Sequence, residues 1–276
     1  MIKIGQYNSL RVIKKVDFGF YLDGDIYGDI LLPRKYAAKN TAIGESIEVF
    51  IYLDSEDRIV ATSLKPKALV GECAYLKVVE VNRIGAFLDW GLPKDLLVPF
   101  NQQQKPMIKG YSYTVYVYVD ELTERIAASS RLEEFLTDKP DQLGPNQAVE
   151  LMIYAKSDLG FKAVINGRYL GQLFNNEVFR PLHYGEKIPG FIKQVRSDGK
   201  IDLRLQQAAH LARNSLAEKI LKHLSENEGV SELTDKSPPE EIYNTFGVSK
   251  SIYKKALGLL YKNRQINIEK HQIKLV

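Results

Sequence analysis

Aromatic side chains that alternate with aliphatic ones are the residues of this chain with the clearest chemical meaning. In IEVFIYLD (residues 47–54) and TVYVYVD (114–120), the aromatic positions share one face of an extended chain and the aliphatic positions share the other. The aromatic residues, with the arginine that follows each stretch, are Phe50, Tyr52, Arg58, Tyr116, Tyr118 and Arg125. Aromatic rings can stack on unpaired bases and arginine can neutralise phosphate, so this pattern favours noncovalent recognition of nucleic acid.

Both stretches belong to an internal repeat. VDFGFYLDGDIYGDILLP (16–33) matches VNRIGAFLDWGLPKDLLVP (81–99), and the spacing from Gly19 to Gly85 equals that from Gly44 to Gly110. A more divergent third copy begins at DLGFKAVINGRYLGQL (158–173). Each copy contains several short apolar segments broken by glycine, proline and aspartate, which is typical of a small all-β barrel.

The last part of the chain has helical periodicity instead. Ala212, Leu216, Ile220 and Leu224 recur at every fourth position, and Gly229 ends the pattern. SPPEEIYNTFG (237–247) predicts a short helix, Ser249 is expected to cap another, and INIEKHQIKLV (266–276) reads as two short strands. Three helices followed by a hairpin predict a winged helix.

The third helix of this part is expected to carry a basic face. At 3.6 residues per turn its lysines fall on the side opposite the apolar residues, with an arginine just beyond. These residues are Lys250, Lys254, Lys255, Lys262 and Arg264. Lysine favours contact with a nucleic-acid backbone over base reading. The alternative is that this is only the solvated face of an amphipathic helix.

Composition limits the other classes of function. A net charge of +4 and a pI of about 8.8 permit a polyanionic partner. Cys73 is the single cysteine, so no intrachain disulfide is possible, and we expect a reduced, cytoplasmic location. No segment reaches the roughly 18 apolar residues of a membrane helix, so no membrane partner is expected. The four histidines are scattered and no catalytic motif is present, so we expect neither an enzyme, a cofactor nor a metal.

Further motifs connect the repeats to a known domain. The first copy has Phe18-Gly19-Phe20-Tyr21, Gly44, Asp54 and Arg58, and the second has Gly85-Ala86-Phe87, Gly110, Asp120 and Arg125. In these features the repeats resemble S1-type OB-fold RNA-binding domains. With the terminal winged helix, the whole chain resembles the conserved virulence factor B family, which is regarded as RNA-binding and as acting in bacterial gene regulation.

This resemblance implies a mostly β chain with an α C-terminal part. Three tandem S1-like five-stranded OB barrels would occupy residues 1–66, 67–138 and 139–208, and a winged helix residues 209–276. The nucleic acid would lie on the outer face of the barrels. The residues implied there are Phe18, Tyr21, Asp54 and Arg58 in the first barrel, Ile84, Phe87, Asp120 and Arg125 in the second, and Leu159, Lys162 and Lys200 in the third.

Some of these roles have alternatives. Asp54 and Asp120 are expected either to bind a ribose hydroxyl or to hold the neighbouring arginine. The third copy has Val195 or Arg196 at the position of Asp54. Where S1 domains have a histidine on the return strand, the three copies have Pro33, Pro99 and Gln172. Phe18 and Phe87 could instead pack in or between barrels, and Trp90 could pack against the next barrel rather than stack on a base.

The sequence thus predicts a non-catalytic protein that regulates gene expression by binding single-stranded RNA. The first two barrels would hold the strand and the winged helix would add contacts to its backbone. Two other functions stay open at this point. One is a regulator that binds duplex DNA through the winged helix, and the other is a scaffold on the ribosome or RNA polymerase.

Overall fold

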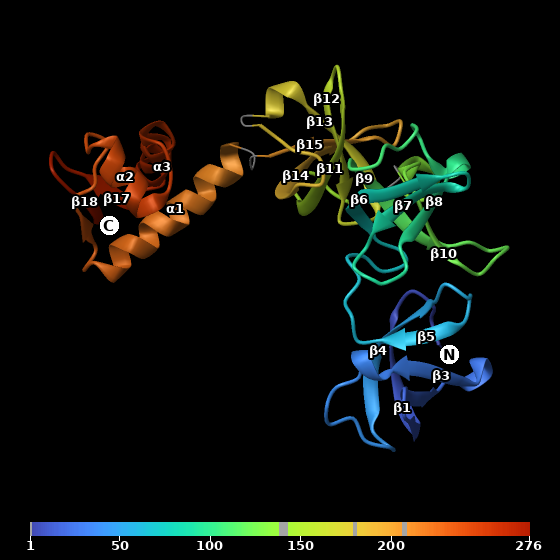
Figure 1. Cartoon of the computed structure of the whole chain (residues 1–276). Helices are drawn as coiled ribbons and strands as arrows, with labels where there is room; N and C mark the ends of the chain where they lie inside the picture. The colour runs from blue at the N-terminus through green and yellow to red at the C-terminus, as the bar shows by residue number, and fades with distance from the viewer. Residues whose placement is uncertain (1, 138–142, 179–180, 206–208) are drawn as a thin grey trace. The chain divides into compact units, whose positions relative to one another are not determined.

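The computed structural model describes residues 2–137, 143–178, 181–205 and 209–276, with side chains from 216 onward in the last range. It divides into two compact units, Met1–Leu205 and Gln206–Val276 (Figure 1). The predicted domain boundaries after residues 138 and 208, and the side chain of Ala212, lie outside the described residues.

The first unit contains three closed five-stranded barrels, which confirms the predicted fold class (Figure 1). The first barrel consists of β1 (Tyr7–Val16), β2 (Gly19–Asp23), β3 (Asp29–Pro33), β4 (Ser46–Leu53) and β5 (Ile59–Thr62). The second consists of β6 (Cys73–Asn82), β7 (Gly85–Asp89), β8 (Leu96–Pro99), β9 (Ser112–Val119) and β10 (Ile126–Ser129). The third consists of β11 (Ala148–Ser157), β12 (Gly160–Ile165), β13 (Tyr169–Phe174), β14 (Lys187–Val195) and β15 (Ile201–Arg204). Short 3₁₀ helices lie at Asp25–Tyr27, Arg34–Tyr36, Phe100–Gln102, Leu132–Glu134 and Asn175–Glu177.

A glycine begins the second strand of every barrel because the neighbouring strand passes too close for a side chain. A Cβ on Gly19 or Gly85 would lie 2.3 Å from the carbonyl oxygen of Leu32 or Val98, respectively. On Gly160 it would lie 2.2 Å from a carbonyl oxygen of the third barrel. These are distances that real Cβ atoms do not adopt, so the repeated glycine is a requirement of the barrel.

The strand register is also repeated. The first strand of each barrel has an irregularity at the same place, between Val12 and Lys14 in the first and between Val78 and Glu80 in the second. The third barrel has it between Ile153 and Ala155. Because a bulge shifts which side chains face outward, equivalent surface residues are identified by this register.

The second unit is a winged helix, as predicted. Its elements are α1 (Ala209–Glu226), β16 (Val230–Ser231), α2 (Pro239–Phe246), α3 (Lys250–Lys262), β17 (Ile266–Ile268) and β18 (Ile273–Leu275). Its small sheet has the order β16-β18-β17, so the predicted hairpin gains a third strand. Tyr253 lies in the core, and its hydroxyl donates a hydrogen bond of 2.7 Å to the carbonyl of Leu233.

Two local predictions for α3 need correction. Ser249 stands at its N-cap, but its side chain forms no capping hydrogen bond, and its carbonyl accepts from the backbone of Ile252 and Tyr253 instead. Ile252, expected on the packed side, is exposed. Among the described helices, none has the length and apolar character needed to cross a membrane.

Candidate nucleic-acid interface

Phe50 and Tyr52 lie on the outward side of β4, as the alternation predicts, but the second barrel covers them. Phe50 is 0% exposed, and its ring lies 5.9 Å from that of Trp90 in an edge-on arrangement. Burial raises the pKa of Tyr52 to about 12. The prediction that Phe50 and Tyr52 stack on RNA is therefore corrected, because their rings form the junction of the first two barrels.

Trp90 belongs to this same junction. It is buried, and its indole N–H donates a hydrogen bond of 2.6 Å to the carbonyl of Lys94. The packing alternative for Trp90 is therefore the correct one. Its partner is the preceding barrel rather than the next.

Charged residues reinforce the junction. The Lys94 ammonium donates to the carbonyl of Asp54 at 2.6 Å and lies 3.4 Å from the Asp57 carboxylate. Arg125 of the second barrel pairs with the same Asp57. Arg125, predicted to contact RNA, is thus held in an ion pair with the first barrel.

The two aspartates predicted to orient arginines behave differently. Arg58 donates to the Asp54 carboxylate through Nε at 2.9 Å and Nη2 at 2.7 Å. Partial burial would raise the pKa of Asp54, but hydrogen bonds from the Arg58 side chain and from nearby backbone N–H groups outweigh it and lower the pKa. Asp120 instead accepts from the backbone and hydroxyl of Thr123 at 2.9 and 2.8 Å. The prediction that Asp120 orients its neighbouring arginine is therefore corrected. Asp54 has the geometry that this role requires.

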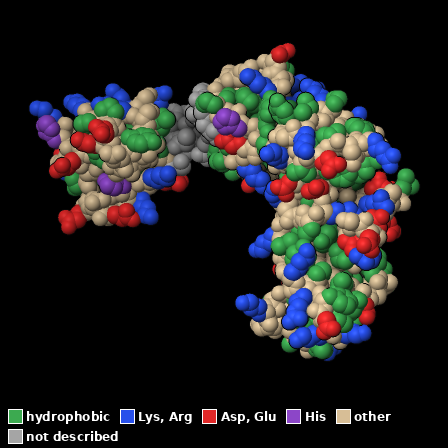
Figure 2. Space-filling model, viewed as in Figure 1, with side chains coloured by type: hydrophobic (Ala, Val, Ile, Leu, Met, Phe, Trp, Pro, Cys, Tyr) green, Lys and Arg blue, Asp and Glu red, His purple; other side chains and the backbone are tan. Residues whose placement is uncertain are grey.

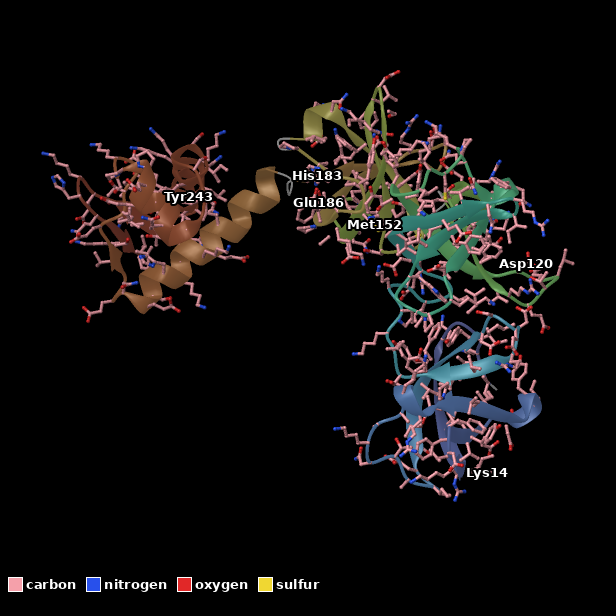
Figure 3. The ribbon with its side chains drawn as sticks, in the orientation of Figure 1. Lys14, Asp120, Met152, His183, Glu186 and Tyr243 are labelled. Atoms are coloured by element: carbon pink, nitrogen blue, oxygen red, sulfur yellow. The ribbon has the colours of Figure 1, made fainter. Side chains whose placement is uncertain are left out.

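The first barrel presents an open aromatic pair. Phe18 is 59% exposed, and its ring lies edge-on to that of half-buried Tyr21 at 6.4 Å. Lys14 is the cross-strand neighbour of Tyr21, with its Nζ 6.0 Å from the ring centre. The Arg34 backbone donates to the carbonyl of Phe18 at 2.9 Å. Lys14 lies at the end of the first barrel away from the second, where basic and hydrophobic side chains are interspersed (Figures 2 and 3).

These four residues, Lys14, Phe18, Tyr21 and Arg34, are called the first-barrel surface below. Lys14 and Arg34 have no carboxylate within ion-pair distance among the described residues. Neither was predicted from the sequence. The signal that identifies Lys14 is its register with Tyr21 across the bulge of β1, which spacing along the chain does not reveal.

The corresponding face of the second barrel has the opposite charge. Glu80 is the cross-strand neighbour of Phe87, where the first barrel has Lys14 beside Tyr21. A cavity of about 660 Å³ adjoins Phe87, and its acidic lining residues are Asp57, Glu80, Asp95 and Asp120. Its basic lining residues, Lys94 and Arg125, are the two that pair with Asp57. Burial, with the charges of Asp89 and Glu80, raises the pKa of Asp95. This face therefore repels phosphate where the first-barrel surface attracts it.

The third barrel has its predicted lysines in ion pairs. The Lys162 ammonium lies 3.5 Å from Glu133, and that of Lys200 lies 3.8 Å from Asp198. The backbone N–H of Arg196 bonds to the carbonyl of Lys200 at 2.8 Å, as that of Asp54 does to Arg58, so Arg196 occupies the Asp54 position. Phe174 pairs with Gly160 as Pro33 pairs with Gly19. Phe174, rather than Gln172, therefore corresponds to Pro33.

Tyr116 and Tyr118 are also covered. Both rings lie 4.9 Å from that of Phe135, which follows the second barrel, and both side chains are half-buried. Tyr116 also packs against a buried cluster that includes Cys73 and Met152, from the second and third barrels (Figure 3). Their predicted role as open stacking platforms is corrected for the same reason as that of Phe50.

The basic residues of α3 lie on its outer side. Lys254, Lys255, Lys262 and Arg264 are exposed. Lys250 is half-buried and donates to the carbonyl of Lys236 at 3.1 Å, and Lys254 lies 3.6 Å from Asp235. Among the described residues, no carboxylate lies within ion-pair distance of Lys255, Lys262 or Arg264.

Comparisons with known proteins agree with this domain content. Residues 218–275 match the CvfB-like winged helix domain, and residues 4–64 and 70–129 match the S1 domain. The Bacillus subtilis protein YitL is 28% identical over 95% of this chain and 90% of its own length. Conserved virulence factor B of Staphylococcus saprophyticus is 28% identical over 84% of this chain and 80% of its own length.

A solved structure was also found. It is described as a multidomain protein with nucleic acid binding domains from Streptococcus pneumoniae, and it is 23% identical over 99% of this chain and 98% of its own, with a TM-score of 0.43. S1 domains and a winged helix indicate nucleic-acid binding. With S1 domains followed by a CvfB-like winged helix, the chain is similar over most of its length to the conserved virulence factor B proteins.

Proposed function

We propose that this chain is a non-catalytic, cytoplasmic protein that binds single-stranded RNA and thereby regulates gene expression. The observation that carries the proposal is the first-barrel surface, where an exposed aromatic pair adjoins two cations that have no carboxylate partner among the described residues. Unpaired bases stack on such rings, and the cations neutralise the phosphates between them. Single strands suit this surface because their bases are free to turn outward.

Arg58 extends the first-barrel surface in this proposal. The register aligns Tyr21, Leu31 and Val60 across β2, β3 and β5. Val60 lies two strand spacings, about 10 Å, from Tyr21, and Arg58 lies two residues, about 7 Å, further along the chain, so the backbones of Arg58 and Tyr21 are about 12 Å apart. A few nucleotides of an extended strand can span that separation. Asp54 holds the guanidinium in one orientation through Nε and Nη2, and Nη1 pairs with the exposed carboxylate of Glu56 at 2.8 Å, so a phosphate would take the place of Glu56 at that edge.

A charge exchange between the first two barrels tests the proposal. Lys14→Glu should weaken binding of a single-stranded RNA and reduce the slope of log K against log salt by about 0.7, the value of one phosphate contact. Glu80→Lys should strengthen binding, since it supplies the second barrel with the cation that the first has. Fluorescence anisotropy of a labelled oligonucleotide over a salt series measures both. Lys222→Glu, at an exposed position of α1, makes the same charge change elsewhere. Equal effects of Lys14→Glu and Lys222→Glu would contradict the assignment.

The basic side of α3 favours a second candidate function, binding of duplex DNA by the winged helix. Lys255, Lys262 and Arg264 are exposed and have no carboxylate partner among the described residues, and a helix of this kind can contact a duplex backbone.

Charge reversal at two positions of α3 separates the two functions. The double variant Lys254→Glu with Lys255→Glu should reduce affinity for single-stranded RNA by about tenfold, because the winged helix adds only backbone contacts. Anisotropy with matched single-stranded RNA and duplex DNA measures this. Loss of all binding to both nucleic acids in this variant would favour the duplex-binding function.

A further inference from the structure

A groove of about 380 Å³ between the second and third barrels is lined mainly by tyrosines. None of its lining residues is among those that the S1 resemblance implies. Its tyrosines are Tyr75, Tyr111, Tyr113, Tyr154 and Tyr184, and its basic residues are Lys105 and Lys156. Among the described residues, no aspartate or glutamate lines it. We call this set of residues the tyrosine groove.

Close packing between the barrels builds the groove. The ring of Tyr75, from β6, lies against the backbone of Gly185 in the turn before β14, where a Cβ would come within 2.3 Å of the ring. This turn is attached to β11, since Gly185 N–H donates to the Ile153 carbonyl at 2.7 Å and Ile153 N–H to that of Glu186 at 3.0 Å. Figure 3 shows Glu186 on the third barrel. Tyr184, the residue before Gly185, is thereby placed beside the second barrel.

The tyrosines divide into supporting and open ones. The hydroxyl of Tyr113 accepts a hydrogen bond from the Ile108 backbone at 3.1 Å, which fixes that ring. Burial and the nearby Glu133 raise the pKa of half-buried Tyr154, so it carries no negative charge at neutral pH. Tyr111 is 64% exposed and Tyr184 is 48% exposed. Tyr111 and Tyr184 therefore offer the most accessible rings for stacking. Tyr75, Tyr113 and Tyr154 form the side of the groove against which they lie.

The charge of the tyrosine groove suits a polyanion. Lys105 and Lys156 are both exposed, and neither has a carboxylate within ion-pair distance among the described residues. The Lys156 ammonium lies 5.6 Å from the ring centre of Phe161. The cavity beside Phe87 differs in having four carboxylates in its lining. Of the two aromatic hollows, only the tyrosine groove therefore combines stacking surface with net positive charge.

We propose that the tyrosine groove is a second contact site for a single-stranded nucleic acid, in which bases stack on Tyr111 and Tyr184 while Lys105 and Lys156 neutralise phosphates. This inference rests on the proposed function and adds a site whose residues the S1 resemblance does not imply. Two sites in one compact unit gain affinity for a strand that reaches both, because the second contact forms at high effective concentration. A strand too short to reach both would gain nothing.

The test is a double variant, Tyr111→Ala with Tyr184→Ala, titrated with a labelled uridine-rich RNA of about 30 nucleotides by anisotropy. The loss of two stacking partners should weaken binding by about 30-fold or more. Tyr111→Phe with Tyr184→Phe keeps both rings and should bind as the unchanged protein does. Tyr243→Ala removes an equally exposed tyrosine of the second unit, and it should also have no effect.

The outcomes separate this inference from the proposed function. If only Phe18→Ala with Tyr21→Ala weakens binding, the tyrosine groove is not a nucleic-acid site, and a protein partner on the groove would give that result. If only the groove variant weakens binding, the groove is supported as a nucleic-acid site and the assignment of the first-barrel surface is wrong. If neither does, both assignments fail. Ultraviolet cross-linking of the same RNA to the Phe18→Ala with Tyr21→Ala variant, which keeps the groove, should yield adducts at Tyr111 or Tyr184 on peptide mapping. Their absence would contradict the inference.

Discussion

Replacement of both Phe18 and Tyr21 with alanine is expected to weaken binding of single-stranded RNA by about 30-fold or more without unfolding the protein. Each stacked aromatic ring contributes about 1 to 3 kcal/mol to the affinity for a single strand. The two rings are in contact, so the double variant is more informative than the sum of single ones. Phe18 is exposed, so its removal leaves no internal cavity.

Anisotropy and urea unfolding measure the two parts of this prediction. Ile26→Ala is a suitable control, because it removes a similarly exposed apolar side chain from the first barrel that has no part in the first-barrel surface. If the Phe18→Ala with Tyr21→Ala variant binds RNA as tightly as the Ile26→Ala control does, the first-barrel surface does not bind RNA. Weak binding together with a lower unfolding free energy would show instead that the rings support the barrel.

Phe50→Ala is expected to lower the free energy of unfolding by about 3 to 5 kcal/mol, which is the usual effect of removing a fully buried phenylalanine. The ring fills the junction of the first two barrels, between Tyr7 at 5.8 Å and Trp90 at 5.9 Å. Trp90 is the only tryptophan of the chain, so its fluorescence during urea unfolding reports on this junction. The emission of the native variant should shift to longer wavelength as water reaches the indole.

The control for this prediction is Phe18→Ala, which makes the same chemical change at an exposed position. Its unfolding midpoint should match that of the unchanged protein. A Phe50→Ala variant as stable as Phe18→Ala would mean that the first two barrels do not pack as described. RNA affinity unchanged by Phe50→Ala under native conditions would agree with its structural role.

The order of the barrels and the winged helix could be predicted because their signals are local and repeated. The glycine at the start of β2, β7 and β12 recurs for a steric reason, and its spacing is visible in the sequence. Helical periodicity and the position of Gly229 likewise predict α1 and its end. The alternation in β4 correctly separates Val49 and Ile51, in the barrel core, from the outward Phe50.

The environment of the outward side chains could not be predicted in the same way. Alternation indicates which side of a strand a residue occupies, and it carries no information on whether another barrel covers that side. Phe50 and Tyr116 share the same repeat position, and different neighbours bury them, namely Trp90 and Phe135. Lys14 was missed for a related reason, since its contact with Tyr21 depends on a bulge in β1. The tyrosine groove draws its residues from two barrels, and no spacing in the sequence unites them.

The most direct test of the central claim is the affinity of the unchanged protein for three matched ligands: a uridine-rich single-stranded RNA, the single-stranded DNA of the same sequence, and duplex DNA. Anisotropy over a salt series gives both affinity and salt dependence. We predict that the RNA binds most tightly and keeps much of its affinity at moderate salt, because stacking is insensitive to screening. Tighter binding of the duplex, with a steep salt slope, would contradict the account and assign the function to the winged helix.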